Sequence, residues 1–321
     1  MKEIVLATIM LIIGFILLIK GADFFVEGSA SVAKRLRVPS LIIGMTIVAM
    51  GTSLPECAVS VTASITNNNA LAISNAVGSN IFNLMVVCGF CALFTPLAVQ
   101  ENTLKRDFPF SIIVAGVLLV LGFFGMSLGR VDGIILLVVF VIFILMMIKS
   151  AKNARNKDVI IESEEAKEAA EKILPVWKCI LFIIGGAVAI AIGGDMVVNG
   201  ASTIAAGFGL SQTLIGLTIV AMGTSLPELV TSIVAARKDE VDMALGNVIG
   251  SNIFNILFVL GIASTISPIV FIMENVIDIL ILIIMSIVVL IFAGSKKKIT
   301  RPEGIVMLLS YAVYMVYVCI R

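Results

Sequence analysis

Apolar residues occupy long runs of the chain, and polar residues are confined to the stretches between them. Most of these runs reach about 20 residues, the length that an α-helix needs to cross a bilayer. The pattern predicts ten membrane-spanning helices, at residues 4–32, 39–65, 70–97, 108–127, 131–149, 176–205, 211–236, 241–267, 275–293 and 303–320. The one long polar segment, 150–175, has a charged and helix-favouring sequence that predicts a solvated connector or surface helix.

Composition leads to the same fold class. Of the 321 residues, 60% are hydrophobic and 13% are charged, whereas soluble domains have about 25% charged residues. We therefore expect an all-α polytopic membrane protein with the lipid bilayer as its surroundings. The first apolar run lacks a basic leader and a small-residue cleavage site, so we interpret it as a retained helix. The net charge of +1 gives no reason to expect nucleic acid as a partner, and no obligate protein partner is evident.

Lysine and arginine residues gather on one side of the predicted helices. If the N-terminus is outside, 18 of them fall on the cytoplasmic side and three fall outside, while Lys20 lies within the first span. Positive residues are enriched in the cytoplasmic loops of membrane proteins. The sequence therefore predicts a multi-pass protein of the cell membrane whose N- and C-termini both lie on the extracytoplasmic side.

Two motifs occur twice at an offset of 172 residues. The sequence TIVAMGTSLPE fills Thr46–Glu56 and again Thr218–Glu228, and Asn75–Asn83 closely matches Asn247–Asn255. The copies lie five predicted spans apart, and an odd number of crossings turns the second copy upside down. An inverted-topology repeat of this kind is typical of secondary transporters, which bind their ions where the repeats meet.

The loop charges agree with this inversion. Lys34 and Arg35 are predicted to be cytoplasmic, whereas their counterparts Ala206 and Gly207 are uncharged and predicted to be outside. We therefore expect two inverted repeats of five helices each. The predicted divisions are a first repeat at 1–149, a cytoplasmic connecting loop at 150–175 and a second repeat at 176–321.

A proline and a glutamate interrupt each GTSLPE helix. Pro55 and Pro227 lack an N–H group and clash with the carbonyl four residues earlier, so each should free backbone carbonyls of its helix. At membrane depth such carbonyls require protein, water or an ion as a partner, and they are hard donors that suit Na⁺ and Ca²⁺. Glu56 and Glu228 each add an intramembrane carboxylate, which is a candidate functional group.

Hydroxyl and amide groups complete this candidate cation site. The chain contains no histidine, and Cys88 and Cys91 lie in an apolar helix where small buried side chains are expected. Zinc, copper and iron are therefore disfavoured. The candidate ion-binding residues are Ala49, Thr52, Ser53, Glu56, Ser79, Asn83, Ala221, Thr224, Ser225, Glu228, Ser251 and Asn255.

Through these motifs the chain closely resembles the sodium/calcium exchanger family of the calcium/cation antiporter superfamily, over nearly its whole length. The resemblance implies Na⁺ and Ca²⁺ as transported ions and requires no cofactor. It implies that Glu56 and Glu228 hold Ca²⁺ together with oxygens near Thr52 and Thr224. It places the sodium positions at Ala49, Thr52, Ser79 and Glu56 and at Ala221, Thr224, Ser251 and Glu228. Some relatives carry an acidic residue in place of Asn255, which leaves potassium dependence and proton coupling open.

We expect a secondary active antiporter that exchanges Na⁺ for Ca²⁺ by alternating access, with electrogenic extrusion of Ca²⁺. The corresponding long spans 4–32 and 176–205 are the candidates for the moving bundle. A Ca²⁺/H⁺ antiporter and a K⁺-dependent exchanger are alternatives. Buried carboxylates outside any ring disfavour a passive cation channel, and the lack of a nucleophile–base pair disfavours an enzyme. Asp23 and Asp195 also correspond, and a structural role is favoured over an ion path.

Overall fold

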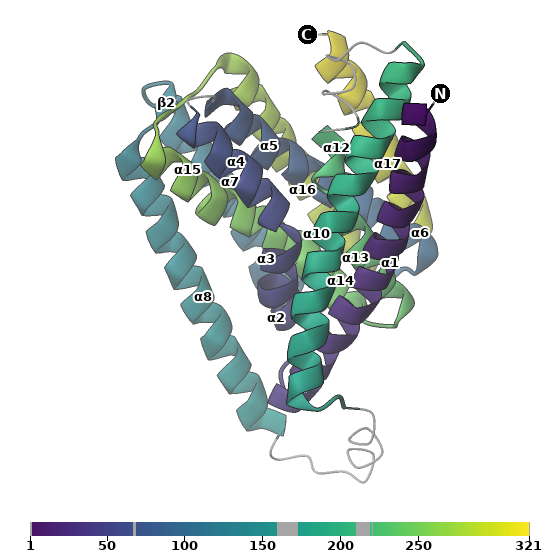
Figure 1. Ribbon diagram of the computed structural model, residues 1–321. Helices are drawn as coiled ribbons and strands as arrows, with labels where there is room; N and C mark the ends of the chain where they lie inside the picture. Colours follow the sequence, from purple (N-terminus) through teal and green to yellow (C-terminus); the bar gives the residue numbers. More distant parts are fainter. Residues whose placement is uncertain (1, 67–68, 159–172, 210–218, 220, 321) are drawn as a thin grey trace.

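The computed structural model describes residues 2–66, 69–158, 173–209, 219 and 221–320, and most of them are helical (Figure 1). Before residue 159 the helices are α1 (Lys2–Leu36), α2 (Ser40–Ile43), α3 (Ala49–Thr52), α4 (Leu54–Ile65), α5 (Asn69–Phe82), α6 (Cys88–Phe94), α7 (Phe108–Phe123) and α8 (Arg130–Asp158), with π-helical turns η1 (Gly44–Val48), η2 (Asn83–Val87) and η3 (Thr103–Asp107). After residue 172 they are α10 (Val176–Gly207), α12 (Ala221–Gly223), α13 (Leu226–Arg237), α14 (Val241–Phe254), α15 (Leu260–Ile266), α16 (Met273–Lys296) and α17 (Arg301–Ile320), with the π-helical turn η5 (Asn255–Val259).

The apolar runs coincide with the spans of the structure. Among the described residues, eight helices are long and apolar enough to cross a membrane, and the bent pair Ser40–Thr52 and Leu54–Ile65 makes a ninth span. These nine lie at nine of the ten predicted positions. In the remaining prediction, 211–236, residues 211–218 and 220 lie outside the described part of the chain, and α12 and α13 occupy much of the rest.

Helix α8 extends beyond the predicted fifth span. That span was expected to end at residue 149, but α8 continues to Asp158, so the first part of the predicted connector is helical. Alanine, lysine and arginine in this stretch are strong helix formers, so the helix propagates beyond its apolar part. Residues 159–172 of the predicted connector lie outside the described residues.

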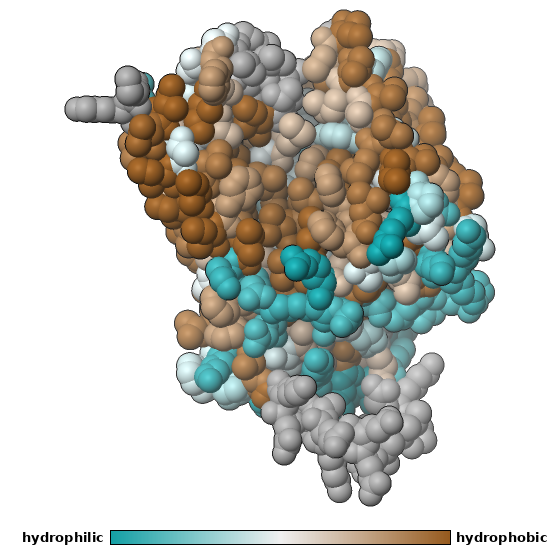
Figure 2. All heavy atoms as spheres, turned by 90° about the vertical axis from the view of Figure 1, so that its right-hand side faces the viewer, coloured by the Kyte–Doolittle hydropathy of each residue, from teal (hydrophilic) through white to brown (hydrophobic). Residues whose placement is uncertain are grey.

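The outer surface identifies the molecule as a multi-pass membrane protein. Large apolar side chains are exposed along the lengths of α1, α8, α10 and α17. On the face shown in Figure 2, hydrophobic side chains cover the upper part and a band of polar side chains lies beneath them. A soluble protein rarely exposes a contiguous apolar surface of this size, whereas a lipid-facing surface requires it.

Helices α1 and α10 form a long pair beside the rest of the bundle (Figure 1). Glycines at seven-residue intervals bring their backbones together: a Cβ added at Gly14 would lie 2.9 Å from the carbonyl oxygen of Gly193. One added at Gly21 would lie 3.0 Å from the carbonyl oxygen of Gly186. Small residues allow this close approach, which drives helix association in lipid.

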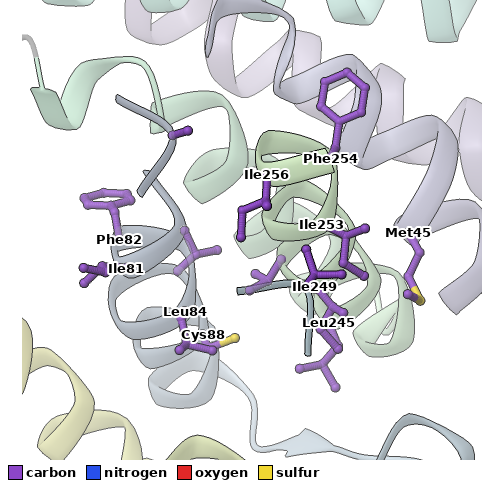
Figure 3. Close-up of a cluster of buried hydrophobic side chains, with 14 of the residues drawn as sticks. Met45, Ile81, Phe82, Leu84, Cys88, Leu245, Ile249, Ile253, Phe254 and Ile256 are labelled. Atoms are coloured by element: carbon purple, nitrogen blue, oxygen red, sulfur yellow. The ribbon is translucent and has the colours of Figure 1, made fainter. Parts of the chain in front are cut away.

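The centre of the protein is formed by the spans α5–η2–α6 and α14–η5–α15. In each of them 78% of an 18-residue apolar stretch is buried inside the protein, compared with 22% of such a stretch in α1. Figure 3 shows buried hydrophobic side chains of these two spans, among them Ile81, Leu84, Ile249 and Ile253. These central spans therefore face protein, while α1 faces lipid over much of its length.

Four two-residue strands are an addition to the predicted all-α fold. Strand β1 (Leu97–Ala98) pairs antiparallel with β4 (Lys298–Ile299), and β2 (Ser127–Leu128) pairs antiparallel with β3 (Ile269–Val270). Each pair joins a segment before residue 159 to a segment after residue 172. The strands lie between successive spans, where they satisfy backbone groups of the connecting segments.

Candidate functional site

Each GTSLPE motif interrupts its helix beside the proline. Ser53 ends α3 with φ −85° and ψ 12°, and Ser225 precedes α13 with φ −92° and ψ 5°. The first interruption bends its span by 49°, as the proline predicts. Glu56 and Glu228 consequently lie in the first turns of α4 and α13. There the free N–H groups and the helix dipole favour a carboxylate.

The two motifs meet at the two glutamates. Glu56 and Glu228 are fully buried, with 0% exposure. Ser53 Oγ donates to Glu228 Oε1 at 2.7 Å, and Ser225 Oγ donates to Glu56 Oε1 at 3.2 Å. Ser79 Oγ also lies 3.5 Å from Glu56 Oε1 as a donor. Because each carboxylate is held by a serine of the other motif, the two motifs form one site.

The GSNIFN segments contribute a second connection across the centre. Asn80 Nδ2 donates to the carbonyl oxygen of Asn252 at 3.0 Å, and Asn252 Nδ2 donates back to that of Asn80 at 3.2 Å. Asn255 Nδ2 donates to Asn80 Oδ1 at 3.2 Å. Asn83 is completely buried beside them. Asn80 and Asn252 were absent from the candidate residues, although their place in a repeated motif could have identified them.

A further pair of asparagines contacts the motif threonines. Thr52 Oγ1 donates to Asn247 Oδ1 at 3.1 Å, and Thr224 Oγ1 donates to Asn75 Oδ1 at 3.5 Å. Asn75 and Asn247 were also missed by the sequence analysis, even though each begins a repeated segment. A neutral amide in a membrane helix commonly forms ordinary hydrogen bonds between helices. The sequence alone therefore gives no reason to assign these two asparagines to the ion site.

The remaining candidates surround this centre. Ser251 Oγ lies 3.5 Å from the carbonyl oxygen of Ala49 and donates to it. A Cβ added at Gly250 would lie 2.8 Å from the Cβ of Ala49, which explains the glycine before Ser251. No described atom of a neighbouring helix lies within 4 Å of a Cβ added at its counterpart Gly78, so this close approach is found at Gly250 and not at Gly78. Ala221 is described through its backbone in α12 alone.

Five buried oxygens of this centre have no hydrogen-bond donor among the described residues. They are Glu56 Oε2, Glu228 Oε2, Asn83 Oδ1, Asn252 Oδ1 and Asn255 Oδ1. A buried acceptor without a partner costs about 1–3 kcal/mol, and a bound cation would satisfy several at once. Among the described residues, no three His, Cys, Asp or Glu side chains gather as a metal cluster. The donors are therefore two carboxylates and neutral oxygens, which fit Na⁺ or Ca²⁺ rather than zinc or copper.

The corresponding aspartates outside this centre differ from each other. Asp23 Oδ1 lies 2.6 Å from Lys238 Nζ, and Glu27 Oε2 lies 3.6 Å from the same nitrogen. Asp23 thus has the contact to a neighbouring element that a structural role requires. Asp195, by contrast, has an exposed side chain. The pairing of Asp23 is not repeated at Asp195, because the counterpart of Lys238 is Thr66.

This combination of fold and site defines a membrane transporter for small cations: buried carboxylates lie on interrupted helices in the middle of a polytopic bundle. The chain belongs to the sodium/calcium exchanger family. The family described as "Sodium/calcium exchanger protein" matches it at residues 6–149 and 178–320, on both sides of the polar connector.

Relatives over nearly the full length agree with this family. The chain is 40% identical to CaxA of Alkalimonas amylolytica over 96% of this chain and 97% of that protein. It is 34% identical to the sodium/calcium exchanger MaX1 of Methanosarcina acetivorans, over 96% of this chain and 97% of MaX1. Its fold matches the sodium-calcium exchanger NCX_Mj soaked with Na⁺ and Sr²⁺ at a TM-score of 0.84 and 33% identity, covering 98% of this chain and 99% of NCX_Mj.

Proposed function

We propose that this protein exchanges Na⁺ for Ca²⁺ across the cell membrane by alternating access, and that the ions bind between Glu56 and Glu228. The observation that carries the proposal is the pair of fully buried carboxylates, each with one oxygen bonded to a serine of the other motif and one oxygen open. Two open carboxylate oxygens can receive one divalent ion or separate monovalent ions. The two ions therefore compete for the same oxygens, and competition leads to exchange.

The proposed ligands are the twelve residues predicted from the sequence. The Ca²⁺ position would use the carboxylates of Glu56 and Glu228 with oxygens of Thr52 and Thr224. Ala49, Ser79 and their counterparts would complete the sodium positions, and Asn83 and Asn255 would fill the remaining central positions. Ser53 and Ser225 are supported as neighbours of the ions by their hydrogen bonds to the two carboxylates.

The proposed architecture is ten spans in two inverted repeats, at 1–149 and 176–321, joined by a cytoplasmic loop at 150–175. Three observations related by the offset of 172 support it. The Ser53–Glu228 bond corresponds to the Ser225–Glu56 bond. The amides of Asn80 and Asn252 donate to each other's carbonyls. Strand β1 corresponds to β3, and each pairs with a strand from the other repeat.

Charge explains why exchange would be obligatory. Two ionised glutamates carry a charge of −2, and one Ca²⁺ neutralises them. An empty site would keep that charge inside the membrane, where an unpaired charge is costly. Only the loaded site would then change sides. The long α1–α10 pair is the proposed moving bundle, because it packs along the remaining helices at one side of the molecule (Figure 1).

The energetics favour three Na⁺ for each Ca²⁺. Moving one Ca²⁺ out against about 100 mV costs about 4.6 kcal/mol, and a ten-thousandfold gradient adds about 5.5 kcal/mol. Each Na⁺ entering down the same potential and a tenfold gradient releases about 3.7 kcal/mol. Two Na⁺ release about 7.4 kcal/mol and three about 11 kcal/mol, so only three exceed the total of about 10 kcal/mol. Such an exchange moves one net charge inward for each Ca²⁺ extruded, and these gradients set the direction of transport.

The test uses purified protein in liposomes loaded with Na⁺ and diluted into Na⁺-free medium containing radioactive Ca²⁺. We expect uptake that depends on the Na⁺ gradient and is stimulated by an inside-positive potential. Glu56→Gln and Glu228→Gln keep the shape of each side chain and remove its charge, so each should abolish uptake. Glu274→Gln on the exposed first turn of α16 is the matched control and should retain it.

Other outcomes identify other functions. Uptake driven by a pH gradient without Na⁺ would replace the proposal by Ca²⁺/H⁺ exchange, and a strict requirement for K⁺ would indicate a K⁺-dependent exchanger. Unitary currents in planar bilayers would indicate a channel. Full activity of both glutamine variants would refute the proposed site.

A further inference from the structure

Asn75 and Asn247 occupy equivalent places beside the two glutamates. Asn75 lies on α5 and Asn247 lies on α14, at the repeat offset of 172. Asn75 Nδ2 donates to Ser60 Oγ at 3.0 Å and to the carbonyl oxygen of Glu56 at 3.2 Å. The amide nitrogen of Asn75 thus donates to groups of its own repeat.

The second copy reproduces the first contact by contact. Asn247 Nδ2 donates to Ser232 Oγ at 2.9 Å and lies 3.5 Å from the carbonyl oxygen of Glu228. Ser60 and Ser232 each lie one turn beyond their glutamate and are fully buried. The same arrangement therefore occurs twice in the molecule, once beside each glutamate.

The oxygen of each amide, however, faces the other repeat. Asn247 Oδ1 accepts the hydroxyl proton of Thr52 at 3.1 Å, and Asn75 Oδ1 accepts that of Thr224 at 3.5 Å. One amide thus touches the glutamate helix of its own repeat and the threonine of the opposite repeat. No hydrogen bond of this kind follows from the sequence spacing, because the partners are 195 and 149 residues apart.

We infer that Asn75 and Asn247 are positioning residues that couple the two half-sites, each setting the orientation of the opposite threonine according to the position of its own glutamate. The inference rests on the proposed function, because it assumes that Thr52 and Thr224 contribute oxygens to the ions. It adds residues and a role to that site: occupancy of one half changes the geometry of the other.

The hydroxyl of Thr52 explains how the amide acts. It has one proton and three acceptors within reach: Asn247 Oδ1 at 3.1 Å, the carbonyl of Val48 at 3.2 Å and that of Ala49 at 3.3 Å. When the proton goes to Asn247, the carbonyl oxygen of Ala49 is spared this third donor and accepts only the Ser53 N–H at 3.1 Å and the Ser251 hydroxyl at 3.5 Å. When Thr52 donates the proton to a carbonyl of its own helix, that carbonyl oxygen binds a cation less strongly. Asn247 therefore favours the arrangement in which both the hydroxyl oxygen of Thr52 and the carbonyl oxygen of Ala49 can bind an ion.

The two links should differ in strength. Thr52 and Asn247 are both 1% exposed, and their contact is 3.1 Å. Asn75 and Thr224 are partly buried, and their contact is 3.5 Å. A hydrogen bond is stronger when it is short and shielded from water. We expect the larger coupling for the pair Asn247 and Thr52.

Double-mutant cycles in the liposome assay test this inference. Asn247→Ala is combined with Thr52→Val, its partner, and separately with Thr224→Val, which it does not contact. Asn75→Ala is combined with Thr224→Val, its partner, and separately with Thr52→Val as the non-partner control. The readouts are KM for Ca²⁺, kcat and the Hill coefficient for Na⁺. A merely structural asparagine would lower the amount of folded protein or kcat with either threonine variant alike.

We expect each partner pair to depart from the product of its single effects on KM by roughly two- to tenfold, the range for one hydrogen bond. The non-partner pairs should agree with the product, and loss of either asparagine should lower the Hill coefficient for Na⁺. Equal coupling with both threonines, or none with either, would overturn the inference. If one asparagine variant does not fold, the other cycle decides. Wild-type protein without Na⁺-driven uptake would instead contradict the proposed function.

Discussion

Replacing Gly186 with alanine tests the packing of α1 against α10. A Cβ at this position would lie 2.7 Å from the carbonyl oxygen of Gly21 and 2.8 Å from the backbone nitrogen of Phe25. Because both atoms belong to the backbone, no side-chain rotation can relieve the overlap, and the helices must move apart. The neighbouring residue provides the control: no described atom lies within 4 Å of a Cβ added at Gly185.

The magnitude follows from comparing the two alanines. Overpacking costs about 1–3 kcal/mol, whereas glycine to alanine inside a helix stabilises by about 0.5–1 kcal/mol. Both variants gain the second effect, so the difference between them is the overpacking energy alone, about 1–3 kcal/mol. With an unfolding entropy of about 2.1 cal/mol/K per residue, each kcal/mol corresponds to a shift of about 1.5 °C in the unfolding midpoint of a 321-residue chain. Gly186→Ala should therefore unfold about 1.5–4.5 °C below Gly185→Ala.

The assay is the apparent unfolding midpoint of each purified variant in one detergent, at one protein concentration and one ionic composition. Exchange rates in liposomes are measured beside it, because α1 and α10 are the proposed moving bundle. We expect Gly186→Ala to be both less stable and slower, while Gly185→Ala exchanges at the wild-type rate. Equal midpoints for the two variants would show that the α1–α10 contact is not as close as the structure has it.

Two further predictions concern ion pairs outside the central site. Lys238→Gln removes the ion pairs to Asp23 and Glu27. Because these side chains are partly exposed, we expect the free energy of unfolding to fall by less than about 1 kcal/mol. That loss should shrink further in KCl at about 1 M, which screens the charges, and an unchanged loss would contradict an ionic origin. The hydrogen bond from Lys105, followed by its charge, lowers the pKa of Glu101. A lowered pKa stabilises the folded state above the unfolded pKa, and the contribution disappears as the pH falls through the folded value. Lys105→Gln should therefore differ from wild type in unfolding midpoint at neutral pH and converge with it in acid, and a difference independent of pH would refute the assignment.

The general architecture could be predicted from local patterns. An apolar run of about 20 residues is a sufficient signal for a membrane helix, and nine of the ten predicted spans have counterparts among the described residues. The end of α8 was harder to predict, since Lys152 and Arg155 signal the end of the apolar run but do not end a helix. The short strands were missed because two residues are too few for any periodicity.

The repeat also predicted the centre of the proposed site. Glu56 and Glu228 stand out because a carboxylate in an apolar helix is costly and here occurs twice with the same neighbours. Charge placement and the odd number of spans between the copies led to the predicted inversion.

Only the tertiary structure decided which residues of the two copies touch. That Ser53 binds Glu228 rather than its own neighbour Glu56, and that Asn247 accepts the proton of Thr52, depends on how two distant segments pack. Sequence periodicity reports which face of a helix is apolar, but it does not report which helix lies opposite that face. The sequence by itself therefore determined the spans, the acidic pair and the chemistry of its surroundings. The packing of the central helices determined that these groups lie together, because a hydrogen bond requires its donor and acceptor atoms to be in direct contact.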